Sequence, residues 1–360
     1  MNRRALAGRV QGAFVATLLM AVGAAAQEPR PRVVVIGTGG TIAGVSTTRT
    51  SFQSYRAGQL LIEDLVAELR PQIDSVADVT TIQFGNRSSG SYRVPDFHDL
   101  ALEIDRALET ADGVVVTTGT DTMEEFVYWM DLTVRSQKPV VFTGAMRPWT
   151  VLSPDGPANL FNAIVLAASG ETTCFGTVLA FNDEFHAAKE VWKTDGSRLN
   201  AFISRQSGIL GYIDELRVRT FRAPPRVQYC NDPERWRTPF DLRRISKESL
   251  PRVEALIGYQ GAGLDEAVTA WADAGVKGIV IGGGGVSAAA RSAAQAKGVT
   301  FASTQRFRTG GDGLLPQKAR LLLMLSLAFS SDSTQVRTWI SELSGGDFEV
   351  TARGTASDGG

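Results

Sequence analysis

Histidine and cysteine are scarce in this 360-residue sequence, which contains two of each. So few ligands make a histidine or cysteine metal cage improbable, and we expect neither a metal nor a cofactor. A serine–histidine–aspartate hydrolase is disfavoured too, unless His98 or His186 serves it. There is no excess of positive charge either, because 37 basic and 38 acidic residues give a net charge of −1. The sequence therefore gives no indication of a nucleic-acid partner.

Long hydrophobic runs are missing beyond the first 26 residues, which have the pattern of an export signal. An apolar stretch, 13–24, is too short for a membrane span and ends at the A-x-A pattern Ala24–Ala26. The positive region before it is formed by Arg3, Arg4 and Arg9. We expect export by general secretion, with the twin-arginine route suggested by Arg3 and Arg4 as the less favoured alternative. Cleavage is expected near Ala26 and Gln27, and the mature chain is expected to be periplasmic or secreted and to have no membrane anchor.

The two cysteines, Cys174 and Cys230, could form one disulfide in an oxidising compartment, and the sequence leaves open whether they meet. His98 lies in the stretch 95–108, whose apolar residues recur at helical spacing behind a proline. We expect this histidine on the surface or flank of that helix.

Strand-like and helix-like stretches alternate along the chain, which predicts an α/β fold with parallel sheets. Short β-rich runs are expected at 33–36, 79–84, 113–117, 139–143, 177–181, 253–259 and 278–281. Helices are expected at 62–69, 95–108, 123–132, 158–168, 264–273, 288–296 and 316–329.

The predicted organisation is a larger N-terminal parallel-sheet domain followed by a smaller α/β domain. A stretch rich in proline and arginine separates the two alternating units and reads as a linker. The expected parts are a signal peptide (1–26), an N-terminal catalytic α/β domain (27–221), the linker (222–250), a smaller C-terminal α/β domain (251–350) and a tail (351–360).

The stretch Val33–Gly44 joins a run of β-branched residues to a glycine-rich turn that carries two hydroxyls, Thr38 and Thr41. Such a turn follows the carboxyl end of a buried strand, where ligands bind in open α/β sheets. A dinucleotide fingerprint is disfavoured because Ile42 occupies the place of its third glycine. A tight turn with incidental threonines remains the alternative.

The stretch Gly113–Glu125 repeats this design, with a buried strand, a glycine, and then Thr120 and Asp121 before a helix. A threonine hydroxyl is a weak nucleophile until a base removes its proton. With no suitable histidine, the candidate bases are a carboxylate, a tyrosine or a lysine of lowered pKa. The alternative is that Asp121 or Thr122 only caps the helix.

With both stretches in place, the chain resembles the bacterial L-asparaginase family, and most closely its exported type II branch. The two signatures are Thr38–Gly44 and Gly119–Glu125. Further matching stretches are Gly144–Pro148, Asp155–Pro157, Asn159–Leu160, Asn182–Asp183, Lys193–Thr194 and Pro316–Arg320.

The resemblance implies a role for individual residues. Thr41 matches the family's nucleophile, and Tyr55 matches the tyrosine that polarises it from a mobile lid, 45–59. Thr120, Asp121 and Lys193 match the second hydroxyl, its carboxylate and its lysine. The substrate-binding residues implied are Gly40, Ser89, Gly90, Gly119, Thr120, Asp121 and Ala145. Of these, Ser89 would hold the substrate α-carboxylate, Asp121 would meet the α-amino group, and N–H groups near Thr120 and Ala145 would form the oxyanion hole.

Departures from the family pattern concern the rim of the site. Gly90 stands where the family usually has a glutamine, and Arg87 stands where it usually has an apolar residue. We expect Arg87 to point at water, with a bound substrate carboxylate as the alternative. The family's asparagine and glutamate that reach a neighbouring subunit's site have no clear counterpart in 282–288 and 309–316, where Ser287 or Asp312 could stand in.

The function implied is that of an L-asparagine amidohydrolase, which forms L-aspartate and ammonia through an acyl-threonine. A glutaminase or another ω-amide hydrolase is the alternative within enzymes, and an exported amino-acid-binding protein is the alternative outside them. The partners implied are a small-molecule substrate, L-asparagine or alternatively L-glutamine, and further copies of the chain in a homotetramer or homodimer.

Overall fold

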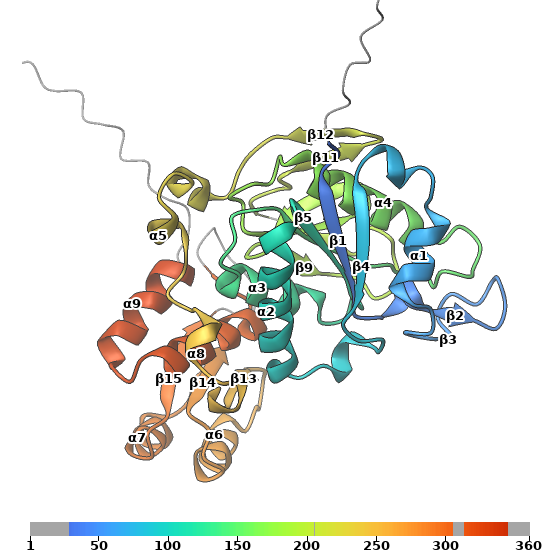
Figure 1. The fold of residues 1–360 in the computed structure, drawn as a ribbon. Coiled ribbons are helices and arrows are strands. Elements are labelled where there is room, and N and C mark those ends of the chain that lie inside the picture. The colour runs from blue at the N-terminus through green and yellow to red at the C-terminus, as the bar shows by residue number, and fades with distance from the viewer. Residues whose placement is uncertain (1–28, 205, 305–312, 345–360) are drawn as a thin grey trace, which may run out of the picture.

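The computed structural model describes residues 29–204, 206–304 and 313–344, which form two α/β units (Figure 1). The expected signal peptide and the tail from residue 351 lie outside these residues. The larger unit is built on an eight-stranded sheet with the order β12-β11-β8-β7-β6-β5-β1-β4. Its five parallel strands are β1 (Arg32–Gly37), β4 (Asp78–Gln83), β5 (Gly113–Thr117), β6 (Val140–Thr143) and β7 (Thr177–Phe181).

Helices cover both faces of the parallel part, which explains why its central strands β1, β5 and β6 are rich in β-branched residues along their whole length. Every residue of β5 is buried. One apolar cluster packs the sheet against α1 (Ile62–Glu68) and α4 (Gly156–Ser169), and another packs it against α2 (Val94–Thr110) and α3 (Met123–Thr133). The predicted parallel sheet is therefore confirmed.

The smaller unit has a three-stranded parallel sheet, β13 (Val253–Ile257), β14 (Gly278–Gly282) and β15 (Thr300–Thr304). Helices α6 (Leu264–Asp273) and α7 (Ala288–Ala296) pack on one side, and α9 (Ser333–Ser344) packs against α8. Helix α8 (Pro316–Phe329) contacts both this sheet and α3, so one apolar cluster spans the two units (Figure 1).

Several elements were not predicted from the sequence. The main sheet continues through three antiparallel strands, β8 (Glu184–Ala187), β11 (Gly211–Asp214) and β12 (Arg217–Thr220). These strands have four residues each, and β12 lies at the exposed edge with mostly polar side chains, so no hydrophobic periodicity marks it. Strand β15 and helix α9 were missed as well.

The stretch 222–250 is folded against the larger unit. It contains the short helices η4 (Pro225–Tyr229), α5 (Pro233–Trp236), η5 (Leu242–Arg244) and η6 (Lys247–Ser249). The side chains of Trp236 and Phe240 are buried in it. His98 faces this stretch, with Nε2 3.2 Å from the Ile245 carbonyl oxygen, and is buried. The expectation of a surface histidine was wrong because the stretch covers that flank of α2.

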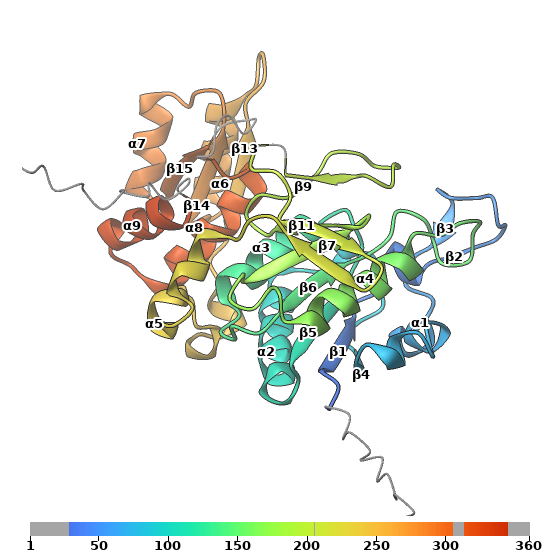
Figure 2. The ribbon, with the colours of Figure 1, turned by 90° about the horizontal axis from the view of Figure 1, so that it is seen from above.

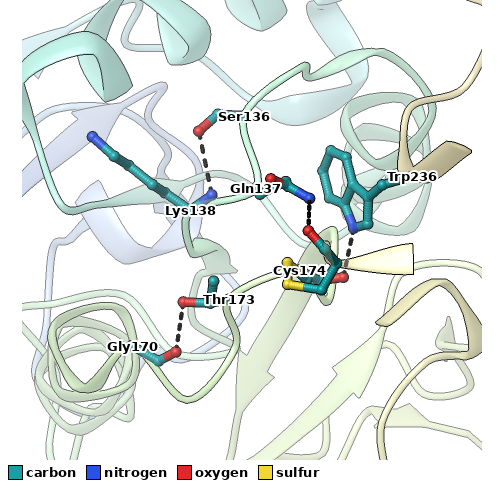
Figure 3. The surroundings of a disulfide bond; sticks show 8 residues. Ser136, Gln137, Lys138, Gly170, Thr173, Cys174 and Trp236 are labelled. Carbon is teal, nitrogen blue, oxygen red and sulfur yellow. Dashed lines mark hydrogen bonds between the residues drawn. A yellow bond between two sulfur atoms is a disulfide. The ribbon is translucent and has the colours of Figure 1, made fainter. Parts of the chain in front are cut away.

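Cys174 and Cys230 form a disulfide with their Cα atoms 5.5 Å apart (Figure 3). The backbone at each cysteine is hydrogen-bonded to a neighbouring side chain. Trp236 Nε1 donates to the Cys174 carbonyl and Gln137 Nε2 donates to the Cys230 carbonyl, each at 2.8 Å. The bond ties the stretch 222–250 to the loop before β7. It answers the question that the sequence left open. Within the described ranges, no helix has the length and apolarity needed to cross a membrane.

Candidate active site

Four neighbouring parallel strands deliver the expected site residues from their carboxyl ends. Thr41 follows β1, Ser89 follows β4, Thr120 and Asp121 follow β5, and Ala145 follows β6. Strand β1 lies between β4 and β5. After β1 the chain forms β4 on one side of it and then crosses to form β5 on the other side. Such a reversal of strand order opens a crevice at the carboxyl edge of an α/β sheet. The two signature turns stand at this reversal.

The turns after β1 and β5 touch backbone to backbone. A Cβ atom on Gly40 would lie 2.3 Å from the Gly119 Cα, and Gly40 has φ 85°. A Cβ on Gly119 would in turn lie 3.0 Å from the Ser89 nitrogen and Oγ. Only glycine allows this approach, which gathers three of the expected substrate-binding residues in one place.

Thr41 begins a short 3-10 helix, η1 (Thr41–Ala43), and its side chain meets the lid. Its Oγ1 lies 2.6 Å from the hydroxyl oxygen of Tyr55, which comes from β3 (Tyr55–Arg56). Strand β3 pairs with β2 (Val45–Ser46) in a hairpin that projects beyond the sheet on the side away from the smaller unit (Figure 2). The two residues that the sequence expected to act together are therefore in direct contact.

The hairpin also touches the loop after β6. The Leu152 nitrogen donates to the Arg49 carbonyl at 2.7 Å, and the Arg147 guanidinium lies 4.8 Å from the centre of the Phe52 ring. These contacts hold the hairpin beside the crevice, with Tyr55 over Thr41.

Lys193 joins the second hydroxyl to its carboxylate. It lies in β9 (Trp192–Lys193), which pairs with β10 (Phe202–Ile203). Its Nζ donates to Thr120 Oγ1 at 2.8 Å and to Asp121 Oδ1 at 2.7 Å. The lysine side chain is 13% exposed and that of Asp121 is 83% exposed. The structure thus brings Thr120, Asp121 and Lys193 together and leaves Asp121 open to a ligand.

Ser89 and Gly90 stand at the rim in η3 (Ser89–Ser91). Ser89 is buried, and its Oγ accepts a hydrogen bond from the Thr122 nitrogen at 3.3 Å, so its hydroxyl hydrogen can still be donated. A Cβ on Gly90 would meet no atom within 4 Å. The rim is therefore open where the resemblance would place a glutamine.

The loop after β6 is fixed by a buried carboxylate. Asp155 accepts from the nitrogens of Met146 at 2.8 Å and Arg147 at 2.9 Å. Burial raises the pKa of this carboxyl, and the two N–H donors partly oppose that rise. The arrangement fixes the loop that follows the buried Ala145. The preceding Gly144 lies against the turn after β5, since a Cβ there would come 2.5 Å from the Thr118 carbonyl oxygen.

Two residues near the site have structural partners. Thr38 Oγ1 donates to the Thr117 carbonyl at 2.9 Å and is fully buried, so this hydroxyl holds β1 to β5. The Arg87 guanidinium pairs with Asp96 at 2.9 Å and lies 4.1 Å from the centre of the Tyr92 ring. It is half exposed, but it is held by these neighbours rather than pointing freely at water.

His186 is fully buried on strand β8. Its Nδ1 lies 3.2 Å from Ser204 Oγ, and its Nε2 lies 3.6 Å from Glu184 Oε2. Burial lowers the pKa of His186 to about 4, with the Arg222 charge acting in the same direction. Ser204 is buried as well, so a substrate could reach neither the serine nor the histidine, although the Glu184 side chain is 33% exposed.

One layer of contacts behind Lys193 was not anticipated. Glu124 is buried in the first turn of α3 and accepts from the Lys193 nitrogen and from Gln317 of α8. Lys318 is also buried on α8. Both residues lie in stretches that match the family, Gly119–Glu125 and Pro316–Arg320, but the resemblance implied no role for them. The available signal was a carboxylate and a lysine on faces that are otherwise apolar.

In the described ranges, no three residues among histidine, cysteine, aspartate and glutamate are grouped so that they could hold a metal ion. The groups available for chemistry are two hydroxyls on turns that are in backbone contact. The Thr41 hydroxyl is hydrogen-bonded to Tyr55, and the Thr120 hydroxyl is hydrogen-bonded to Lys193.

The comparisons with known proteins agree with this geometry. The family model described as asparaginase, N-terminal, matches residues 32–226. L-asparaginase 2 of Bacillus subtilis (strain 168) is 35% identical over 346 residues, which cover 89% of this chain and 88% of the relative. A probable periplasmic L-asparaginase of Haemophilus influenzae is 35% identical over 335 residues, covering 87% and 93%.

Among solved structures, the crystal structure of a probable cytoplasmic L-asparaginase from Campylobacter jejuni is similar, with a TM-score of 0.79 and 34% identity. The match covers 86% of this chain and 99% of that one. The two-unit α/β architecture, the paired threonine turns and these similarities lead to one conclusion: the chain belongs to the asparaginase family of enzymes.

Proposed function

We propose that the protein hydrolyses L-asparagine to L-aspartate and ammonia with Thr41 as the nucleophile. The observation that carries the proposal is a pair of held hydroxyls, Thr41 beside Tyr55 at 2.6 Å and Thr120 beside Lys193 at 2.8 Å. They stand on two turns that are in backbone contact. A threonine needs such a partner before it can attack an amide.

The reaction is a double displacement. Thr41 Oγ1 attacks the side-chain amide carbon of asparagine, its proton is passed on, and the C–N bond breaks as the protonated nitrogen leaves as ammonia. Water then attacks the acyl-threonine ester, returns a proton to Thr41 and releases aspartate. Lys193, hydrogen-bonded to both Thr120 and Asp121, gives a route for proton movement without histidine.

The oxyanion formed in each step needs preorganised donors. The backbone N–H groups of Thr120 and Ala145 are suited to this role, because neither donates to another described residue. The substrate's charged end would lie at Ser89 and Asp121, with the Ser89 hydroxyl toward the α-carboxylate and the exposed Asp121 carboxylate toward the α-ammonium. Gly40 and Gly119 let the turns that carry Thr41, Thr120 and Ser89 approach one another around the ligand, and Gly90 borders the ligand at the rim.

A glutaminase is the second candidate. It is favoured by the open space at Gly90, since a longer substrate could use room that a side chain would fill. The glutamine that the family usually has at this position would contact the charged end of the substrate. Its loss costs about 1.5–3 kcal/mol in the binding of asparagine.

The deciding experiment measures ammonia release by the purified mature chain from L-asparagine, L-glutamine, D-asparagine and a β-aspartyl peptide at matched concentrations. We expect the highest kcat/KM with L-asparagine. A preference for glutamine would move the assignment to the second candidate. Calorimetry that showed tight binding of an amino acid without turnover would point to a binding protein instead.

We also propose export to the periplasm or medium, supported by the N-terminal pattern and by the disulfide, which an oxidising compartment maintains. The N-terminal sequence of the secreted protein should begin near Gln27.

Assembly as a homotetramer or homodimer is proposed from the family resemblance. Analytical ultracentrifugation at micromolar concentration should give a mass of two or four chains.

A further inference from the structure

Helix α8 of the smaller unit contacts the site of the larger unit through a hydrogen bond from its Gln317 to Glu124 of α3. Gln317 Nε2 donates to Glu124 Oε1 at 2.5 Å, while Glu124 Oε2 accepts from the Lys193 backbone nitrogen at 2.6 Å. The glutamate is 7% exposed. A buried carboxylate is costly unless its oxygens are hydrogen-bonded, and here each oxygen has one partner. The side chain therefore links three elements, α8, α3 and β9.

The next residue of α8 holds the segment that leads into β9. Lys318 is 0% exposed, and its Nζ donates to the carbonyl of Ala188 at 2.7 Å and to that of Val191. A buried ammonium fixed to main-chain carbonyls leaves little freedom to the chain just before Lys193.

A third contact joins α8 to the first turn of α3. Arg320 pairs with Glu125 at 3.2 Å, and both side chains are largely buried. Burial raises the pKa of Glu125, while the Arg320 charge acts in the opposite direction. Thr120 and Asp121 lie immediately before this turn, so α8 is bound to both sides of the lysine relay.

We propose that Glu124 and Gln317 are positioning residues, which hold the main chain of Lys193 in register with Thr120 and Asp121. The inference rests on the proposed function of Lys193. Its Nζ must meet two acceptors at 2.8 and 2.7 Å, and a long side chain does so reproducibly only from a fixed backbone. The smaller unit thereby sets the geometry of the relay in the larger unit.

The test replaces the amide by a second carboxylate, Gln317→Glu. Two carboxylates would then face each other at the contact that is now 2.5 Å long. They repel when both are ionised and share a proton at lower pH. We expect kcat for asparagine to fall by about 10- to 100-fold at pH 8. The loss should be smaller at pH 5.5, and KM should change by less than about twofold.

Rescue comes from exchanging the two groups. In the double variant Glu124→Gln with Gln317→Glu, the new amide oxygen can accept from Lys193 and its NH₂ can donate to the new carboxylate. We expect kcat to return to within about threefold of wild type, with the pH dependence restored. Gln295→Glu makes the same replacement at an exposed position of α7 and should leave kcat unchanged.

Gln317→Met keeps the side-chain size and adds no charge, so it covers the case in which Gln317→Glu does not fold. It should lower kcat several-fold in a protein that still folds, with a melting temperature lower by a few degrees because one oxygen of the buried Glu124 loses its donor. The proposal is overturned if folded Gln317→Glu and Gln317→Met both keep wild-type kcat, or if the exchange fails to rescue. Thr41→Ala separates the two hypotheses. Full activity in that variant defeats the proposed function, whereas an inactive Thr41→Ala beside a fully active Gln317→Glu defeats only this inference.

Discussion

Gly40 and Gly119 lie so close that a Cβ on the first would come within 2.3 Å of the Cα of the second. They belong to turns that follow different strands, β1 and β5, and the contact is between main chains. Side chains at either position would separate the turns, and with them Thr41 and Thr120. The distance between the two hydroxyls is therefore set by the absence of side chains, not by an interaction between the threonines.

The first prediction follows from this contact. Gly40→Ala should lower kcat/KM for asparagine by about 100-fold or more, because the added methyl group both clashes and strains a residue at φ 85°. Gly90→Ala is the matched control, since its methyl group meets no atom within 4 Å. Steady-state kinetics and circular dichroism compare the two variants. Equal activities would show that the close approach is not required.

The second prediction concerns the lysine. Lys193→Met removes the donor to Thr120 and Asp121 while keeping the length of the side chain, so kcat should fall by at least about 100-fold. Lys193→Arg keeps the charge but cannot give up its proton at neutral pH, and it should be nearly as inactive. Substantial turnover by Lys193→Arg would mean that the lysine acts through charge alone.

The third prediction tests the open rim. Gly90→Gln should lower KM for asparagine by about tenfold with little change in kcat, because a new amide can reach the substrate's charged end from a position with free space. The comparison is again Gly90→Ala, which gains no hydrogen-bonding group. If both variants show the wild-type KM, the missing glutamine is not what limits binding.

The fourth prediction concerns the disulfide. Replacing Cys174 and Cys230 by serine should lower the free energy of unfolding by about 2–4 kcal/mol, since the bond closes a loop across 56 positions of the sequence. Activity at 25 °C should persist because no expected site residue contacts the bond. Urea unfolding and ammonia release measure the two effects. An inactive but stable variant would contradict this separation.

The sequence predicted those features of the fold and the site that depend on short-range patterns. The β-branched runs before Gly37 and Gly119 identified two strands and their turns, and the match to the family placed Lys193 beside Thr120. The buried position of His98 depends on the folded stretch 222–250, whose short helices have no strong periodicity. The bond from Gln317 to Glu124 joins residues 193 positions apart, so only the docking of α8 on α3 reveals it.

The last prediction is a pH dependence of stability caused by His186. Its pKa is about 4 in the folded protein and 6.5 in the unfolded chain, so the unfolded state binds more protons between these values. The stabilisation is fully present above pH 6.5 and is lost as the pH falls toward 4. Between pH 7.5 and 5.0 this amounts to about 2 kcal/mol.

Urea unfolding of wild type and His186→Gln at these two pH values isolates the effect, since the difference between the proteins cancels the other titrating groups. The Glu184 carboxylate 3.6 Å from Nε2 favours the protonated ring, but burial outweighs it. The pKa of Glu184 is itself raised by burial, so its contribution has the opposite sign and weakens stability as the pH rises. Glu184→Gln should therefore still lose free energy of unfolding when the pH is lowered from 7.5 to 5.0. If His186→Gln loses as much stability on acidification as wild type, the buried imidazole is not its cause.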